Sequence, residues 1–169
     1  MTILVAVATR HGSTLEIADV IAEELRYAGH TVEVRDVADG PRLDTYAAVV
    51  VGSAVYMGAW LPEAVHFVDL HQAQLKDKPV WLFSSGPLGA EDPKPTAPPT
   101  NLDALMAHSG ARGHCIFVGK LDKNRLSLGE RLVTRVVGAP EGDFRNWDAI
   151  RNWAREIGQA LEAPVVART

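Results

Sequence analysis

The chain alternates short apolar runs with longer segments of helical periodicity, and this alternation is the feature that most restricts its fold. Five runs, most of them rich in β-branched residues, predict strands. They are Ile3–Ala8, Thr31–Arg35, Ala47–Val51, Val80–Phe83 and His114–Val118. Four are almost continuously apolar, which is typical of parallel strands covered on both faces. The run at 31–35 alternates apolar and charged residues and therefore predicts an edge strand.

The segments between these runs place apolar residues at the spacing of one helix face. They predict helices over Ser13–Tyr27, Pro62–Leu75, Leu102–His108 and Trp147–Leu161, with Asn146 as the cap of the last. The amphipathic segment Leu126–Val137 predicts a further helix. Alternating strands and helices form a parallel sheet with right-handed crossovers and helices on both faces. The sequence therefore predicts a three-layer, doubly wound α/β fold, and its 169 residues suit a single domain over 1–169.

The junction between the first run and the first predicted helix is rich in hydroxyl groups. It consists of Thr9, Arg10, His11, Gly12, Ser13 and Thr14. A strand that passes directly into a helix directs backbone N–H groups and the positive helix end at one place, which suits a phosphate. Neither G-x-G-x-x-G nor G-x-x-x-x-G-K-[ST] occurs at this junction, which excludes the dinucleotide and nucleoside triphosphate loops. An alternative is that Ser13 caps the helix and Glu16 closes a capping box.

Two further loops follow the third and fourth predicted strands and are expected to adjoin the first loop in a parallel sheet. The second contains Ser53, Ala54, Val55, Tyr56, Met57, Gly58 and Trp60, and the third contains Ser84, Ser85, Gly86, Pro87, Leu88 and Gly89. Small residues give both loops thin walls, and Tyr56 or Trp60 offers an aromatic surface. The three loops predict a slot for a planar, partly apolar ligand with one phosphate. The alternative for the two aromatic residues is packing against the following helix.

Composition excludes several functional classes. A net charge of −4 argues against a nucleic-acid binder. Cys115 is the single cysteine and cannot form an internal disulfide; the sequence shows no signal-peptide pattern and no membrane-length apolar run. We therefore expect a cytoplasmic protein. The six histidines are scattered and no G-x-S-x-G motif occurs, so neither a metal site nor a catalytic side chain is predicted.

At its three loops the chain resembles the flavodoxin-like family of FMN proteins. The likeness covers nearly the whole length, and its most specific element is residues 9–14, which match the family's Thr/Ser-x-x-Gly-x-Thr phosphate loop. The resemblance implies FMN as the cofactor and a five-stranded parallel sheet in the order 2-1-3-4-5. It also implies that residues 9–14 hold the phosphate, while residues 53–58 and 84–89 line the two sides of the ring system. A deazaflavin in the same slot is an alternative.

Within this family the chain is more similar to the menaquinone-dependent protoporphyrinogen oxidase branch. The likeness lies in residues 6–12, in Leu126–Gly138 and in Asp143–Trp147. It implies a flavin-dependent oxidoreductase that passes electrons between a small substrate and a quinone or another acceptor. The alternative is a non-enzymatic electron carrier that serves a partner redox protein. Pro87 and Leu88 stand where carriers usually have a second aromatic residue, which favours the enzyme.

Basic residues are concentrated in one part of the chain. Residues 112–135 contain six Lys or Arg and two Asp or Glu. This region includes the predicted helix Leu126–Val137, and its charge motivates the hypothesis of a peripheral contact with anionic lipid and thereby with a quinone. The simpler alternative is that this helix only covers the sheet.

Overall fold

The structure is a computed structural model that describes residues 1–86, 98–121, 142–143 and 145–163. Its strands are β1 (Thr2–Ala8), β2 (Thr31–Asp36), β3 (Ala48–Tyr56), β4 (Ala59–Trp60), β5 (Val80–Ser85), β6 (Gly113–Phe117), β7 (Lys120–Leu121) and β8 (Gly142–Asp143). Its helices are α1 (Ser13–Tyr27), α2 (Pro62–Leu70), α3 (Gln72–Lys76), α4 (Leu102–Ser109) and α6 (Trp147–Glu162), and Val37–Asp39 forms a 3-10 helix. The predicted helix Leu126–Val137 lies outside the described residues.

The five predicted strands form one parallel sheet in the order β2-β1-β3-β5-β6. Counted among those five alone, this is the order 2-1-3-4-5 that the resemblance implies. The alternating strand β2 lies at the edge, as predicted. The strand order reverses between β1 and β3, because the chain goes from β1 to β2 on one side and then crosses to β3 on the other. The α/β flavodoxin-like fold is therefore confirmed.

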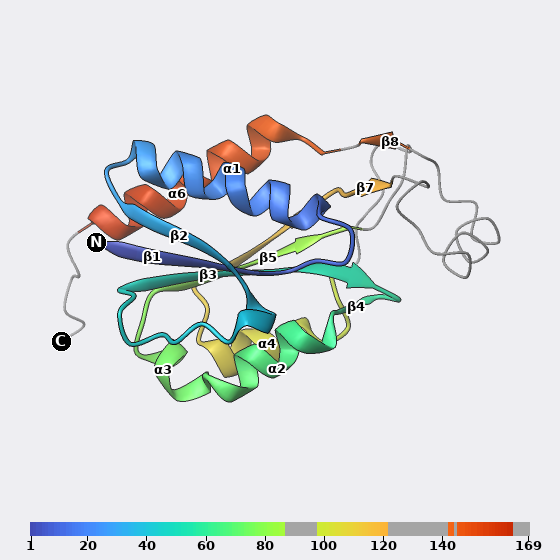
Figure 1. The fold of residues 1–169 in the computed structure, drawn as a ribbon, viewed down its shortest axis with the longest axis horizontal. Coiled ribbons are helices and arrows are strands. Elements are labelled where there is room, and N and C mark those ends of the chain that lie inside the picture. The colour runs from blue at the N-terminus through green and yellow to red at the C-terminus, as the bar shows by residue number, and fades with distance from the viewer. Residues whose placement is uncertain (87–97, 122–141, 144, 164–169) are drawn as a thin grey trace.

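Helices cover both faces of the sheet (Figure 1). The face under α1 and α6 includes Ile3, Val5, Val7, Ile17, Ile21, Ile150 and Ile157. The face under α2, α3 and α4 includes Leu4, Ala6, Val49, Val51, Phe67, Leu75 and Leu105. Successive residues of β1 thus enter opposite cores, which explains why its sequence is continuously apolar.

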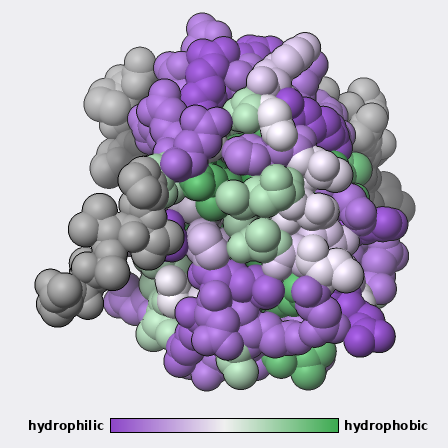
Figure 2. Space-filling model, turned by 90° about the vertical axis from the view of Figure 1, so that its left-hand side faces the viewer, coloured by the Kyte–Doolittle hydropathy of each residue, from purple (hydrophilic) through white to green (hydrophobic). Residues whose placement is uncertain are grey.

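The surface at the end where the parallel strands begin also shows the sheet as a layer between two layers of helices. In Figure 2, apolar and weakly polar residues gather in a middle band of this face, and hydrophilic residues lie above and below it. This is the pattern expected when a buried sheet lies between helices with polar outer surfaces. Among the described residues, no helix combines the length and the apolar character needed to span a membrane.

The third strand is longer than predicted. It continues beyond Val51 to Tyr56, because β4 folds back on it and pairs Val55 with Trp60 and Tyr56 with Ala59. The small residues that suggested a loop are strand residues. Gly52 among them permits a close approach, since a Cβ there would lie 2.0 Å from a ring carbon of Phe83.

The predicted helix Pro62–Leu75 is divided into α2 and α3 at His71. The backbone of His71 has φ −104° and ψ 16°, away from helical values. The carbonyl of Phe67 accepts a hydrogen bond of 3.2 Å from the His71 backbone N–H, and Nδ1 of the same residue lies 3.0 Å from this oxygen. The backbone N–H and the side chain of His71 thus contact the same carbonyl, that of Phe67 in the last turn of α2.

Candidate functional site

The described residues of the three loops that the sequence assigns to the site lie at the carboxyl ends of the parallel strands (Figure 1). Ala8 of β1 pairs with Ser53 of β3, and Ser53 pairs with Ser84 of β5. The strand order reverses at this point, between β1 and β3. Open α/β sheets bind ligands in the crevice outside such a reversal.

The first loop turns through Gly12, whose φ of 84° is left-handed and suits a residue without a side chain. The Gly12 N–H donates a 3.0 Å hydrogen bond to Oγ1 of Thr9. Gly12 is the N-cap of α1, and no side chain caps this helix. The capping-box alternative is therefore wrong: Ser13 is the first helical residue, and the carboxylate of Glu16 pairs with Arg145.

Thr14 has the side chain of this loop that best fits contact with a ligand. Its side chain is 0% exposed, and its Oγ1 has no hydrogen-bond partner among the described residues. A buried polar group without a partner costs about 1–3 kcal/mol. The first backbone N–H groups of a helix also have no acceptor within the helix. A hydroxyl and backbone N–H groups at the start of a helix fit a phosphate, so these residues fit the phosphate end of FMN.

The second loop presents an exposed aromatic ring. Tyr56 is 38% exposed, and the next residue, Met57, is 92% exposed. The chain turns at Met57 and Gly58, both with positive φ. The guanidinium carbon of Arg10 lies 4.5 Å from the centre of the Tyr56 ring, so side chains of the first two loops are in contact.

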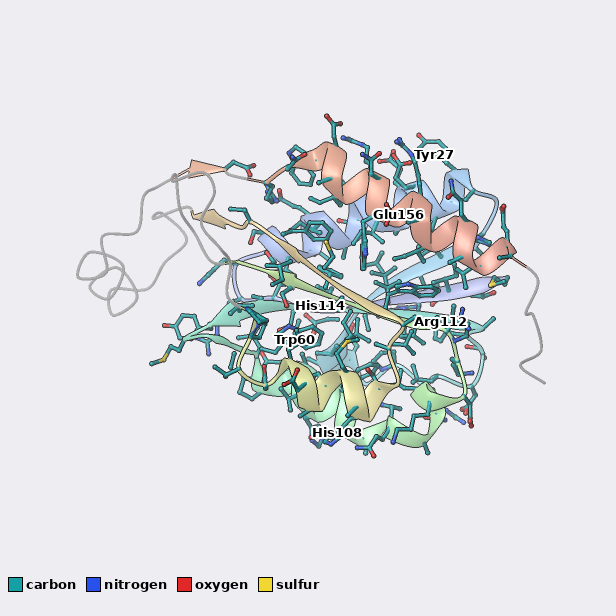
Figure 3. The ribbon with its side chains drawn as sticks, turned by 180° about the vertical axis from the view of Figure 1, so that it is seen from behind. Tyr27, Trp60, His108, Arg112, His114 and Glu156 are labelled. Carbon is teal, nitrogen blue, oxygen red and sulfur yellow. The ribbon has the colours of Figure 1, made fainter. Side chains whose placement is uncertain are left out.

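Trp60 differs from Tyr56 because it is only 3% exposed and belongs to the core on the side of α2 and α4. Its Nε1–H donates a 2.7 Å hydrogen bond to Oγ of Ser84, and this oxygen lies 2.7 Å from Nε2 of His114. Figure 3 shows Trp60 and His114 near one another, on the side of the sheet that α4 covers. Burial lowers the pKa of His114. Of the two aromatic candidates, Tyr56 is thus the one that a ligand can reach.

Ser53 and its neighbours shape the wall between the second loop and the sheet. The Oγ of Ser53 is fully buried, accepts a 3.1 Å hydrogen bond from the Leu61 N–H and donates one of 2.8 Å to the Ala54 carbonyl. This hydroxyl therefore fixes the return of the chain after β4. Ala54 and Val55 are partly buried against the same core.

The third loop comes close to the second one at Gly86. This residue has a φ of 112°, and its N–H donates a 2.9 Å hydrogen bond to the Phe117 carbonyl. A Cβ at Gly86 would lie 3.6 Å from the carbonyl oxygen of Val55. Ser84 and Ser85, predicted as loop residues, end β5. The predicted contacts Pro87, Leu88 and Gly89 lie outside the described residues.

The structure adds Arg145, for which the sequence predicted no role. Its side chain is 2% exposed and contacts the first turn of α1 through the Ser13 carbonyl (3.3 Å) and the Glu16 carboxylate (2.7 Å). It also binds both oxygens of Asp143, which is the main reason that the pKa of Arg145 is raised. Ser13 and Arg145 are 132 positions apart, so no local pattern could have revealed this contact.

The site offers groups that bind and orient a ligand. The first loop supplies hydroxyl groups, backbone N–H groups, the Arg10 guanidinium and the His11 imidazole. The second loop supplies the Tyr56 ring. Burial raises the pKa of the Cys115 thiol, which packs against the core under α1 and α6 and is therefore unsuited to act as a nucleophile. In the described part of the chain, no group of three or more His, Cys, Asp or Glu could hold a metal ion.

Comparisons with known proteins agree with this fold. A family model described as a flavodoxin domain matches residues 4–147. The protoporphyrinogen IX dehydrogenase [quinone] of Escherichia coli K12 is 27% identical over 181 residues, which cover 98% of this chain and 99% of the relative. A flavodoxin structure from the domain Archaea has a TM-score of 0.64 at 16% identity, covering 96% of this chain and 100% of the other. The rubredoxin oxygen:oxidoreductase of Desulfovibrio gigas has a TM-score of 0.62 at 17% identity. The match covers 98% of this chain and 37% of the other.

Proposed function

Because this chain belongs to the flavodoxin domain family, we propose that it binds FMN and acts as an oxidoreductase that passes electrons between a small substrate and a quinone or another acceptor. FMN is the cofactor of this family. The observation that carries the proposal is the hydroxyl of Thr14 at the start of α1. It is buried and has no hydrogen-bond partner among the described residues. A phosphate bound there would supply the acceptor that this hydroxyl lacks.

Each of the three loops has a part in holding the cofactor. Residues 9–14 would bind the phosphate through hydroxyl and backbone N–H groups. Residues 53–58 would contact the ring system on one side, with Tyr56 as the aromatic surface. Residues 84–89 would line the other side, where Gly86 keeps the wall thin.

Bound FMN would supply the redox chemistry, taking two electrons from a donor and passing them to an acceptor. The substrate would lose two electrons and two protons, and the quinone would gain two electrons and two protons to become a quinol. The residues of this chain then have three tasks: to bind the phosphate, to orient the ring and to keep water from its buried side. No side chain needs to act as a nucleophile.

The choice of acceptor and substrate is the finer part of the proposal. The likeness to the E. coli dehydrogenase over almost the whole of both chains supports a quinone as acceptor and a protoporphyrinogen-type substrate. A cytoplasmic location with peripheral membrane contact through Leu126–Val137 would bring the site to a quinone. This segment lies outside the described residues, and co-sedimentation with anionic vesicles at low and moderate salt tests it directly. Failure to co-sediment at either salt concentration would reject the contact.

A second candidate function is electron transfer to a partner redox protein. It is supported by the archaeal flavodoxin, whose fold covers 96% of this chain and 100% of its own. A carrier and a two-electron enzyme differ in how they take up electrons. A carrier is reduced in two separate one-electron steps, whereas the enzyme takes up both electrons together. A deazaflavin in place of FMN would favour two-electron chemistry.

The test begins with the purified protein, its visible spectrum and the mass of the released cofactor. FMN is then titrated into the apoprotein, and the loaded protein is reduced stepwise without oxygen before menaquinone is added. The enzyme is expected to be yellow, to take up two electrons in one step and to be reoxidised by the quinone. A colourless protein that does not bind added FMN at micromolar concentration would overturn the cofactor proposal. Two separate one-electron steps and no reaction with quinone would favour the carrier.

A further inference from the structure

Arg145 joins the segment before α6 to the first turn of α1. Its guanidinium binds the Ser13 carbonyl, the Glu16 carboxylate and both oxygens of Asp143, and it lies 4.3 Å from the centre of the Trp147 ring. The starts of α1 and α6 lie at the same end of the molecule (Figure 1). This buried cation therefore fixes the segment before α6 against the helix that begins at the phosphate loop.

The contact with Glu16 matters because of where this carboxylate is. Glu16 is in the first turn of α1, and its side chain is 44% exposed. A carboxylate in the first turn is attracted by the same partial positive charge and unpaired N–H groups that would bind a phosphate. Without a cation beside it, Glu16 would compete for these donors and would repel a phosphate dianion.

A second observation favours the binding of an anion at this helix start. Thr14, two residues before Glu16, has a fully buried Oγ1 with no partner among the described residues. Arg145 holds Glu16 by Oε2 at 2.7 Å, and the hydroxyl of Thr14 remains for a ligand. The structure thus shows the acidic residue in the first turn of α1 bound to a buried arginine.

We propose that Arg145 is a positioning residue for phosphate binding: it binds the Glu16 carboxylate and thereby leaves the first turn of α1 to the phosphate of the cofactor. This inference rests on the proposed FMN site. It makes Arg145 act through Glu16 and Ser13, without a contact to the phosphate itself. It also predicts that Arg145 affects the phosphate end of the cofactor and not its ring.

The chain offers a matched control further along α1. Glu24, in the same helix, is bound by Arg155 of α6 at 2.9 Å and 3.3 Å. This pair also ties α1 to α6 through a guanidinium and a carboxylate, but it is more than two helical turns away from the phosphate loop. Loss of Arg155 should loosen the contact of the two helices without changing the charge at the start of α1.

The experiment compares the affinity for FMN with that for riboflavin, which lacks the phosphate. Fluorescence titrations are made with the wild type, Arg145→Met, Glu16→Gln, the double variant and Arg155→Met, each checked for native circular dichroism. Arg145→Met is expected to weaken FMN binding about tenfold and to change riboflavin binding by less than about twofold. Glu16→Gln in the Arg145→Met background should restore most of the lost FMN affinity, and Arg155→Met should affect both ligands equally.

If riboflavin binds too weakly to be measured, thermal unfolding with inorganic phosphate, a ligand that has no flavin ring, still tests the inference. Inorganic phosphate should raise the thermal midpoint of the wild-type apoprotein and of Arg155→Met, but raise that of Arg145→Met less. Equal losses of FMN and riboflavin affinity in Arg145→Met, or no recovery in the double variant, would overturn the role of Arg145. Failure of the wild type to bind FMN would instead overturn the proposed function.

Discussion

The indole Nε1–H of Trp60 donates a 2.7 Å hydrogen bond to Oγ of Ser84, and so ties the strand after the second loop to the strand before the third. The same oxygen lies 2.7 Å from Nε2 of His114 on β6. Because an indole N–H can only donate, the Ser84 oxygen accepts from Trp60, and a second hydrogen bond joins the same hydroxyl to the His114 ring. The Ser84 hydroxyl thus links residues of β4, β5 and β6.

Replacing Ser84 by alanine should destabilise the fold by about 1–3 kcal/mol, because the buried Trp60 N–H loses its acceptor and the partly buried His114 ring nitrogen loses the same hydroxyl. Urea denaturation measures the free energy of unfolding. Ser109→Ala is a comparison at another fully buried hydroxyl, whose two hydrogen bonds, to the Leu105 carbonyl and from the Ala111 N–H, are both local. If Ser84→Ala lowers the free energy of unfolding by less than about 0.5 kcal/mol, the hydrogen bonds of Ser84 contribute little.

Stability should fall in acid because of His114. Burial lowers the pKa of this imidazole in the folded protein below its ordinary value of 6.5. Below about pH 6.5 the unfolded chain then binds a proton that the native state excludes, so stability declines until the folded pKa is reached. Above pH 6.5 this contribution is complete. His114→Gln should flatten that part of the profile of unfolding free energy against pH, and an unchanged profile would contradict the assignment.

Thr14→Val should separate stability from cofactor binding. Valine has nearly the same shape but removes the buried hydroxyl, so the apoprotein should keep its stability or gain up to about 1 kcal/mol. Affinity for FMN should fall about tenfold, since the phosphate loses one donor. Thermal unfolding of the apoprotein and FMN titration measure the two effects. A stability loss with unchanged affinity would mean that Thr14 serves only the fold.

Tyr56 and Trp60 should respond in opposite ways. Tyr56→Leu is expected to reduce FMN affinity with little change in stability, because its ring is exposed beside Arg10. Trp60→Leu is expected to destabilise the fold by about 3 kcal/mol or more, through lost core volume and the loss of the hydrogen bond to Ser84. FMN titration and urea denaturation of both variants decide the matter. Weaker FMN binding in Trp60→Leu alone would make Trp60 the ring contact.

Gly52→Ala should be poorly tolerated, because its Cβ would lie 2.0 Å from the Phe83 ring, which is fully buried and packs near Phe117 and Trp153. We expect a loss of about 1–3 kcal/mol or more from overpacking. Gly113→Ala is the control, since its Cβ would meet only Trp81, at 3.6 Å. Equal stability of the two variants in urea would show that Phe83 moves aside freely.

Much of the fold could be predicted because its signals are local. The periodicity of residues 13–27 matches α1, and Asn146 caps α6 by accepting a 3.0 Å hydrogen bond from the Ala149 N–H. The predicted end of the third strand, at Val51, was wrong because Gly52 and Ser53 are residue types typical of loops. Their place in a strand depends on Phe83 and Leu61, which lie elsewhere in the sequence.

By itself, the sequence determined the alternation of strands and helices, the edge position of β2 and the three loops at the carboxyl edge, because each follows from a pattern within one segment. Only the tertiary structure decided that Trp60 is buried on Ser84 while Tyr56 stays exposed, and that Arg145 reaches Ser13 across 132 positions. Periodicity reports which face a residue occupies. Which distant residue it meets there depends on how the strands are ordered and how the helices pack, and no single segment encodes that.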